Sequence, residues 1–175
     1  MPSLGQRLAR GDHAAFTELY DRCADQLVAY AALRMGSRDE GADVVQAAFW
    51  RAVKNRRRFR SVQNPVAYLF QMLRNETLRA QTARRRTRTQ SIADPNAVNG
   101  EHRSSPDHDT EEMINGALAR LTLEDREIIE LKLYTGLTFE EIADILQRPA
   151  SSVATRYRRA LDSLRGWLHK QVSQE

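Results

Sequence analysis

The sequence predicts an all-α protein of two small helical domains joined by a flexible linker, the C-terminal domain being a helix-turn-helix. Apolar residues recur at helical spacing over residues 11–88 and again over residues 110–171. Residues 89–109 are rich in Ser, Asn, Asp and Pro and have almost no apolar surface to bury. The 175 residues include only five prolines and eight glycines, which argues against a loop-rich β-sandwich. We therefore expect the two domains at residues 1–88 and 110–175.

Start and stop signals divide the first domain into three helices. Asp12 stands where it can cap the first helix, and Gly36 follows the last turn of that helix. Asn64 followed by Pro65 indicates another helix start, because Asn is a favoured N-cap and Pro is tolerated in the first helical turn. The three expected helices span about residues 12–35, 38–55 and 65–86.

Capping residues also mark the helices of the second domain. Asp109 with Glu112, and Thr138 with Glu141, have the spacing of capping boxes, in which two side chains satisfy free backbone N–H groups at a helix start. Gly136 is expected to end a helix in the left-handed conformation. The expected helices span about residues 109–120, 123–134, 139–146 and 151–168.

The last two expected helices carry a helix-turn-helix pattern. A short capped helix, a three-residue break and a longer helix share one apolar face. The opposite face of the longer helix offers hydroxyls and arginines, which bond base edges and phosphates. The alternative is a plain helical bundle whose solvated face happens to be basic. The predicted DNA contacts are Ser152, Thr155 and Arg156 for base edges, with Ser151 beside them and Arg158 and Arg159 nearer the backbone.

Positive charge is concentrated in the first half of the chain. Residues 1–90 hold 17 Lys/Arg against 8 Asp/Glu, a net charge of +9, whereas residues 91–120 carry −4 and residues 121–175 carry −1. Six basic residues lie between Arg51 and Arg60, interleaved with aromatic residues. Cations track phosphates while aromatic faces stack on unpaired bases, so this segment is a candidate for binding single-stranded DNA. The alternative is that the aromatic residues are ordinary core and the arginines only keep the surface soluble.

The second expected helix combines acidic, apolar and amide side chains over little more than one turn. These are Asp43, Val44, Val45, Gln46 and Phe49. Val44 and Val45 cannot both point at one core, so we expect Val44 to be exposed. An exposed valine beside Asp43 suits a docking surface for another protein. The alternative is an ordinary solvated helix face.

Enzymatic activity is not expected. No P-loop, GxGxxG, HExxH or GxSxG motif occurs, and the four histidines have no metal-ligand spacing, so neither a cofactor nor a metal is expected. Cys23 is the single cysteine and cannot form an internal disulfide, which favours a reducing, cytoplasmic location. No apolar run is long enough to span a membrane, and the first residues lack the apolar stretch of a signal peptide.

Four sequence segments, in order, resemble the extracytoplasmic-function sigma factors, and the likeness covers about residues 10–168. The first segment is similar to the opening helix of that family, and the second to its polymerase-binding motif. The third is similar to its promoter-melting segment, and the fourth to its C-terminal domain. The segments are residues 11–20; residues 43–49; residues 58–60 with 64–70 and 74–75; and residues 121–127 with 136–143.

The resemblance implies a factor that directs RNA polymerase core to promoter DNA, helps to melt it, and is held inactive by an anti-sigma factor. The helix over residues 151–159 would read the upstream promoter element as duplex. The residues implied to dock on the clamp of the largest polymerase subunit are Asp43, Val44, Gln46 and Phe49. Those implied to bind the downstream element and the melted strand are Arg58, Phe59, Arg60, Ser61, Gln63, Asn64, Tyr68, Arg74 and Asn75.

Departures from the family pattern and two other function classes complete the sequence interpretation. Gln147 replaces the usual turn glycine, at a cost of about 1–2 kcal/mol if the position is left-handed. Ala154 replaces a basic residue and lacks its phosphate contact.

A stand-alone helix-turn-helix regulator would have no use for the basic aromatic segment or the docking motif. A protein-interaction module, such as an anti-sigma partner, would need no arginine-lined recognition helix.

Overall fold

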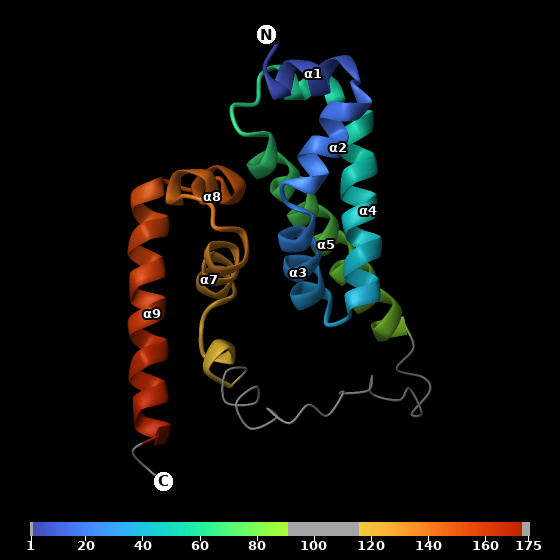
Figure 1. Cartoon of the computed structure of the whole chain (residues 1–175). Coiled ribbons are helices and arrows are strands. Elements are labelled where there is room, and N and C mark those ends of the chain that lie inside the picture. The colour runs from blue at the N-terminus through green and yellow to red at the C-terminus, as the bar shows by residue number, and fades with distance from the viewer. Residues whose placement is uncertain (1, 91–115, 173–175) are drawn as a thin grey trace.

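The computed structural model describes residues 2–90 and 116–172, and the regular secondary structure of these residues is helical (Figure 1). Most of the expected linker and the expected capping box of Asp109 and Glu112 lie outside the described residues. Within the described part of the chain, no helix is long and apolar enough to cross a membrane. The helices are α1 (Leu4–Arg10), α2 (His13–Asp21), α3 (Ala24–Met35), α4 (Arg38–Lys54), the 3-10 helix η1 (Arg56–Arg60), α5 (Pro65–Gln90), α7 (Leu123–Thr135), α8 (Phe139–Leu146) and α9 (Ala150–Val172).

Side-chain caps confirm three of the expected helix starts, and one expected stop is confirmed by a glycine. The Asp12 carboxylate accepts two backbone N–H bonds, of 3.0 and 3.3 Å, at the start of α2. The Asn64 side chain accepts bonds of 2.9 and 3.1 Å at the start of α5. Thr138 and Glu141 form the predicted capping box of α8. Gly136 ends α7 with a φ of 65°, the left-handed conformation expected of a terminating glycine.

The prediction of one continuous helix over residues 12–35 is wrong, because the chain breaks between α2 and α3. Cys23, with a φ of −144°, lies outside both helices, and its N–H donates to the carbonyl of Tyr20 at 3.0 Å. Neither glycine nor proline marks this break. The apolar spacing continues through it because the side chains on both sides face the same core.

The N-terminal lobe is built on a closely packed pair of helices, α3 and α4, with α5 packed against both (Figure 1). Gly41 of α4 makes this approach possible, since a Cβ there would lie 2.6 Å from the backbone nitrogen of Ala32 in α3. Tyr30, Phe70 and Leu73 are fully buried among the three helices. The position of η1 follows from this core, because η1 continues directly from the end of α4.

Helix α1 covers η1 and seals one end of the lobe. A Cβ at Gly5 would lie 2.7 Å from the carbonyl oxygen of Phe59, so only glycine allows this contact. The Phe59 ring is fully buried and meets Phe16 and Tyr68 edge to face, with ring centroids 6.1 and 5.2 Å apart. This aromatic cluster holds η1 and its arginines at the surface of the lobe.

The C-terminal lobe consists of α7, α8 and α9, with α9 packed against the other two. Ile128, Ile142 and Val153, one from each helix, are fully buried. The start of α9 follows a tight turn at residues 147–149, which gives the predicted helix-turn-helix. α9 lies on the side of this lobe that faces away from the N-terminal lobe (Figure 1).

The two lobes are in contact. Helix α7 packs against α3, and helix α8 packs against α5. Buried apolar residues of both lobes belong to one contiguous cluster. The part of α5 that follows η1 in the chain therefore lies next to the C-terminal lobe.

Gln147 adopts the left-handed conformation, with a φ of 53° and a ψ of 50°. We expect Gln147→Gly to stabilise the C-terminal lobe by up to about 1 kcal/mol, because glycine removes the Cβ strain but loses more entropy on folding. Thermal unfolding followed by circular dichroism measures the effect. Gln147→Ala is the control and should not stabilise the protein. A glycine variant that melts below the native chain would contradict this account of the turn.

Candidate nucleic-acid interface

An open groove of about 590 Å³ on α9 brings together most of the residues predicted to read the upstream element. Asp125 of α7 and Pro149 of the turn also line it. The Thr155 hydroxyl donates to the carbonyl of Ser151 at 2.8 Å and keeps its lone pairs free to accept. Arg158 is exposed but lies outside the groove. The predicted residues that line the groove are Ser151, Ser152, Thr155, Arg156 and Arg159.

Arg156 is held in this groove by two acids from the first turn of α7. One terminal nitrogen of its guanidinium lies 2.9 Å from Asp125, and the other lies 3.2 Å from Glu124. The side chain is 38% exposed, so neither pair is deeply buried. The acids fix the position of the guanidinium, and a base contact by Arg156 uses its remaining donor capacity or displaces the acids.

A second cationic surface lies on η1 at the end of the N-terminal lobe. Arg58 and Arg60 are exposed there, as are Ser61 and Gln63 in the turn that follows. The Ser61 hydroxyl donates to the carbonyl of Arg58 at 3.1 Å. Phe59 has to be removed from the residues predicted to bind the melted strand, because its ring is fully buried and cannot stack on a base in this structure. The single aromatic residue of η1 faces inward, and its four arginines are exposed.

Two residues predicted to bind the melted strand contact the C-terminal lobe instead. Arg74 makes a two-pronged pair with Glu127 of α7, with nitrogen–oxygen distances of 2.9 and 3.0 Å. Asn64, whose oxygen caps α5, donates through its amide nitrogen to Glu141 of α8. Asn75 is exposed and Tyr68 is partly buried against Phe59. In this arrangement, carboxylates of the C-terminal lobe accept the hydrogen bonds of two side chains that were expected to bind DNA.

These contacts belong to a buried charge cluster between the lobes. Arg34 of α3 lies 3.5 Å from Glu127 and 3.0 Å from Glu130 of α7. The side chains of Glu127 and Glu130 are only 8% and 3% exposed. Burial, assisted by the negative charge of Glu127, raises the pKa of the Tyr30 hydroxyl beside them. Sequence reasoning missed this cluster, because Arg34 and Glu130 are far apart in the chain.

The predicted docking face of α4 is smaller than expected, and it gains one residue. Asp43 and Gln46 are exposed, but Val44 is buried at 8% exposure, so the expectation that Val44 is exposed was wrong. Val44 and Val45 are both buried because α4 is enclosed on more than one side, by α3 and α5. Phe49 turns away from Asp43 and packs against α2. Trp50, at 61% exposure, shares the face of Asp43 and Gln46, and its seven-residue spacing from Asp43 could have revealed it.

The single cysteine is structural. Cys23 is 2% exposed, and its thiol donates to the carbonyl of Leu19 at 3.1 Å. Burial raises the pKa of Cys23 to about 11, so the thiol stays protonated at neutral pH.

Two sequence models of the sigma-70 family match this chain. The model of Sigma-70 region 2 matches residues 19–88, and the model of Sigma-70 region 4 matches residues 111–164. The chain is 29% identical over 174 residues to the ECF RNA polymerase sigma-E factor of Haemophilus influenzae, over 93% of this chain and 92% of that protein. The chain belongs to the extracytoplasmic-function (ECF) sigma factors. It is therefore a sigma factor that acts in transcription initiation. The resemblance seen in the sequence is confirmed.

Further relatives agree with this assignment. This sigma factor is 25% identical to the RNA polymerase sigma-H factor of Pseudomonas aeruginosa, over 92% of this chain and 90% of that one. Its fold matches the sigma factor RpoE of Bartonella quintana, solved in complex with the anti-sigma factor NepR, with a TM-score of 0.68 and 25% identity over 88% of this chain and 96% of that chain. CnrH in complex with the cytosolic domain of CnrY has the same fold, with a TM-score of 0.69 and 24% identity over 95% of this chain and 96% of that chain. The expected all-α fold of two helical domains is confirmed.

Proposed function

We propose that this sigma factor binds RNA polymerase core, directs it to promoters with two separate elements, and helps to open the DNA at the downstream element. Residues 1–88 hold the polymerase and the opened strand. Residues 110–175 read the upstream element as duplex through the α9 groove, and residues 89–109 connect the two units. The protein acts by binding alone and contributes no catalytic step.

The observation that carries this proposal is the presence of one cationic surface on each lobe. On η1, Arg56, Arg57, Arg58 and Arg60 are all exposed, and within the described residues no acid pairs with them. On α9, arginines and hydroxyls share an open groove at the start of a recognition helix. A single duplex-reading protein needs only the second surface. The first suits a strand whose bases are unpaired, because cations and aromatic residues bind such strands without reading a groove.

The exposed face of α4 is the proposed contact with the polymerase clamp. Asp43, Gln46 and Trp50 lie together on it, and tryptophan is among the residues most often found at interaction hot spots. Phe49 is not part of this face. We place the protein in the bacterial cytoplasm because the polymerase acts there. An anti-sigma factor is a further proposed partner, as NepR is for the Bartonella relative.

Arg74 and Asn64 of the N-terminal lobe can bind promoter DNA only after the contact between the lobes has opened. Arg74 and Asn64 are paired with carboxylates of α7 and α8 and cannot bind phosphates at the same time. The interface combines these ion pairs with buried apolar contacts, so polymerase and DNA have to supply the free energy that separates the lobes.

A gel-shift experiment with and without core polymerase tests the proposal. We expect a specific promoter complex only when both the chain and the core enzyme are present. Specific binding of duplex promoter DNA by the chain alone would favour a stand-alone regulator. Failure to bind DNA under either condition, with retained binding to another protein, would favour an interaction module.

Arg156→Ala is expected to weaken the distinction between a promoter and a scrambled upstream element by about tenfold, because one arginine contact with a base is worth about 1–3 kcal/mol. Association with core polymerase should not change, since Arg156 lies in the other lobe from α4. Arg165→Ala, at 77% exposure on the same helix but outside the groove, is the matched control. Equal losses of promoter discrimination and polymerase binding would contradict the role given to Arg156.

A further inference from the structure

The two arginines that line the α9 groove differ in what holds them. Arg156 pairs with Asp125 at 2.9 Å and with Glu124 at 3.2 Å. Arg159 is exposed, and no acid of the described residues pairs with it. A guanidinium without a partner moves with its long side chain and can follow phosphates along the backbone. A guanidinium that is held in one place can instead select one base.

The Asp125 carboxylate is itself fixed through both of its oxygens. Oδ1 accepts from Arg156 at 2.9 Å, and Oδ2 accepts from the Thr122 hydroxyl at 2.7 Å. The same hydroxyl accepts from the backbone N–H of Asp125 at 3.1 Å, the bond that caps α7. The Asp125 side chain is only 22% exposed. A chain of hydrogen bonds therefore connects the first turn of α7 to the guanidinium on α9.

Glu124 adds a second contact to the same guanidinium. One of its oxygens lies 3.2 Å from Arg156, and the other lies 3.0 Å from Nε of Arg148 in the turn before α9. An isolated ion pair at a surface contributes little, but several linked charges restrict a side chain more than one pair does. Arg156 is thus held by a network that spans α7, the turn and α9.

The two acids leave Arg156 able to bind a base. Each terminal nitrogen carries two hydrogens, so a pair with one acid on each leaves an N–H on both terminal nitrogens, and the Nε–H also stays available. Guanine offers two acceptors, N7 and O6, side by side in the major groove, whereas adenine places a donor beside its N7. A guanidinium that is fixed in advance therefore fits guanine better than adenine, and it loses less side-chain entropy on binding.

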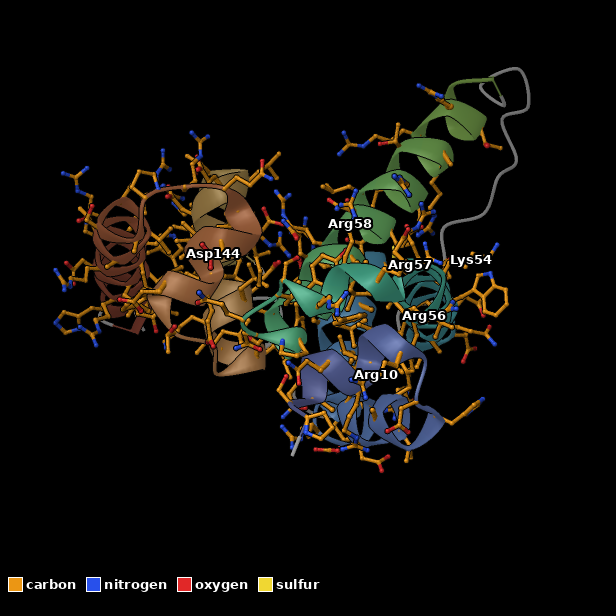
Figure 2. The ribbon with its side chains drawn as sticks, turned by 90° about the horizontal axis from the view of Figure 1, so that it is seen from above. Arg10, Lys54, Arg56, Arg57, Arg58 and Asp144 are labelled. Carbon is orange, nitrogen blue, oxygen red and sulfur yellow. The ribbon has the colours of Figure 1, made fainter. Side chains whose placement is uncertain are left out.

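The groove is open to duplex DNA in this arrangement of the lobes. Helix α9 lies on the far side of the C-terminal lobe from the labelled arginines Arg56, Arg57 and Arg58 (Figure 2). Asp144 of α8, labelled in the same view, is exposed and does not line the groove. Within the described residues Asp144 makes no ion pair, so it offers a control for the removal of one negative charge from this lobe.

We propose that Asp125 is a positioning residue that, with Glu124, fixes Arg156 for the recognition of one guanine in the upstream element. The inference rests on the proposed function, because that function brings duplex DNA into the α9 groove. It adds α7 to the parts of the protein that determine the sequence preference. The competing explanation is that the acids only reduce the positive charge of the groove, in which case their removal strengthens binding to every sequence equally.

The test uses holoenzyme assembled from the full chain and core polymerase, with promoter DNA whose upstream element is randomised. Sequencing the DNA that the holoenzyme retains gives the base preference at each position. For the native chain we expect one position with a guanine preference that Arg156→Ala weakens about tenfold. Asp125→Ala should weaken the preference at the same position about fivefold, and Asp144→Ala should leave it unchanged.

The double variant Arg156→Ala, Asp125→Ala measures whether the acid acts through the arginine. We expect the double variant to have the same guanine preference as Arg156→Ala alone, because Asp125 has no other route to the base. Asp125→Ala alone should keep its overall affinity for DNA, since the released arginine is free to bind a phosphate. Its affinity should then fall more steeply with salt, by about one phosphate contact.

Three results would overturn the inference. The first is a native guanine preference in Asp125→Ala, whatever its overall affinity. The second is an equal loss of preference at every position, which would mean that Asp125 only supports the fold of the lobe. The third is an Arg156-dependent preference for a base other than guanine.

Arg156→Ala separates this inference from the proposed function. If Arg156→Ala lowers the guanine preference and Asp125→Ala does not, the inference alone fails. If Arg156→Ala keeps the native preference at every position, α9 does not read the element in the way proposed, and the proposed function fails. If Asp125→Ala does not fold by circular dichroism, Asp125→Asn decides, because it keeps the shape and an acceptor oxygen but loses the charge. A smaller loss at the same position is then expected, and no loss would overturn the inference.

Discussion

Phe59→Ala is expected to lower the free energy of unfolding of the N-terminal lobe by about 3–5 kcal/mol, the usual cost of removing a buried phenylalanine ring. The ring is fully buried and contacts Phe16 and Tyr68, and the carbonyl of Phe59 lies under Gly5 of α1. Its loss leaves a cavity at the junction of α1, α2, η1 and α5. Urea unfolding followed by circular dichroism measures the change.

Trp50→Ala is the matched control for Phe59→Ala. Trp50 is 61% exposed, so its removal should cost less than about 1 kcal/mol while it weakens the proposed contact with polymerase. The pair of variants separates a structural aromatic residue from an interacting one. A Phe59→Ala protein with native stability but reduced affinity for single-stranded DNA would contradict the buried position and place the ring against a base.

Glu127→Gln is expected to weaken the closed arrangement of the two lobes by about 3 kcal/mol, because removing one partner of a buried ion pair leaves the other charges uncompensated. Glu127 is the shared partner of Arg34 and Arg74 across the interface. Once the lobes separate, water can hydrate both arginines. We expect a larger radius of gyration in small-angle X-ray scattering and tighter binding of DNA by the holoenzyme.

Glu124→Gln provides the comparison for Glu127→Gln. Glu124 pairs with Arg148 and Arg156, all within the C-terminal lobe, so its removal leaves the interface between the lobes unchanged. The two acids are on the same helix, and each substitution removes one negative charge. Identical radii of gyration for the native chain and both variants would show that the ion pairs do not hold the lobes together.

The local structure was largely predictable, because its signals are short. Asp12, Asn64 and Thr138 cap their helices through residues two or three positions away, and Gly136 terminates α7 by its own conformation. The left-handed conformation of Gln147 was also anticipated as a possibility from its place in the turn. The break at Cys23 was not predictable, since no turn-forming residue stands there and helical spacing continues across it.

The less predictable features depend on contacts between distant parts of the chain. Arg74 was assigned to DNA from its local setting, but its partner Glu127 is 53 residues away. The expectation that Val44 is exposed assumed that α4 meets the core on one side only, and the number of helices packed around α4 cannot be read from its own sequence. Arg156 was predicted to contact base edges from the last helix; it lines the groove there, whereas its pairing with Asp125 depends on how α7 and α9 pack. Residue type predicted the chemistry of these groups, and packing determined which partner each one met.

The most direct test of the central claim is to transcribe genomic DNA of the source organism with core polymerase, with and without the purified chain. The 5′ ends of the transcripts are then sequenced. The account predicts new start sites that appear only with the chain and that share two upstream sequence elements at a constant separation. Start sites identical to those of core polymerase alone, together with protection of duplex DNA by the chain in the absence of polymerase, would contradict it.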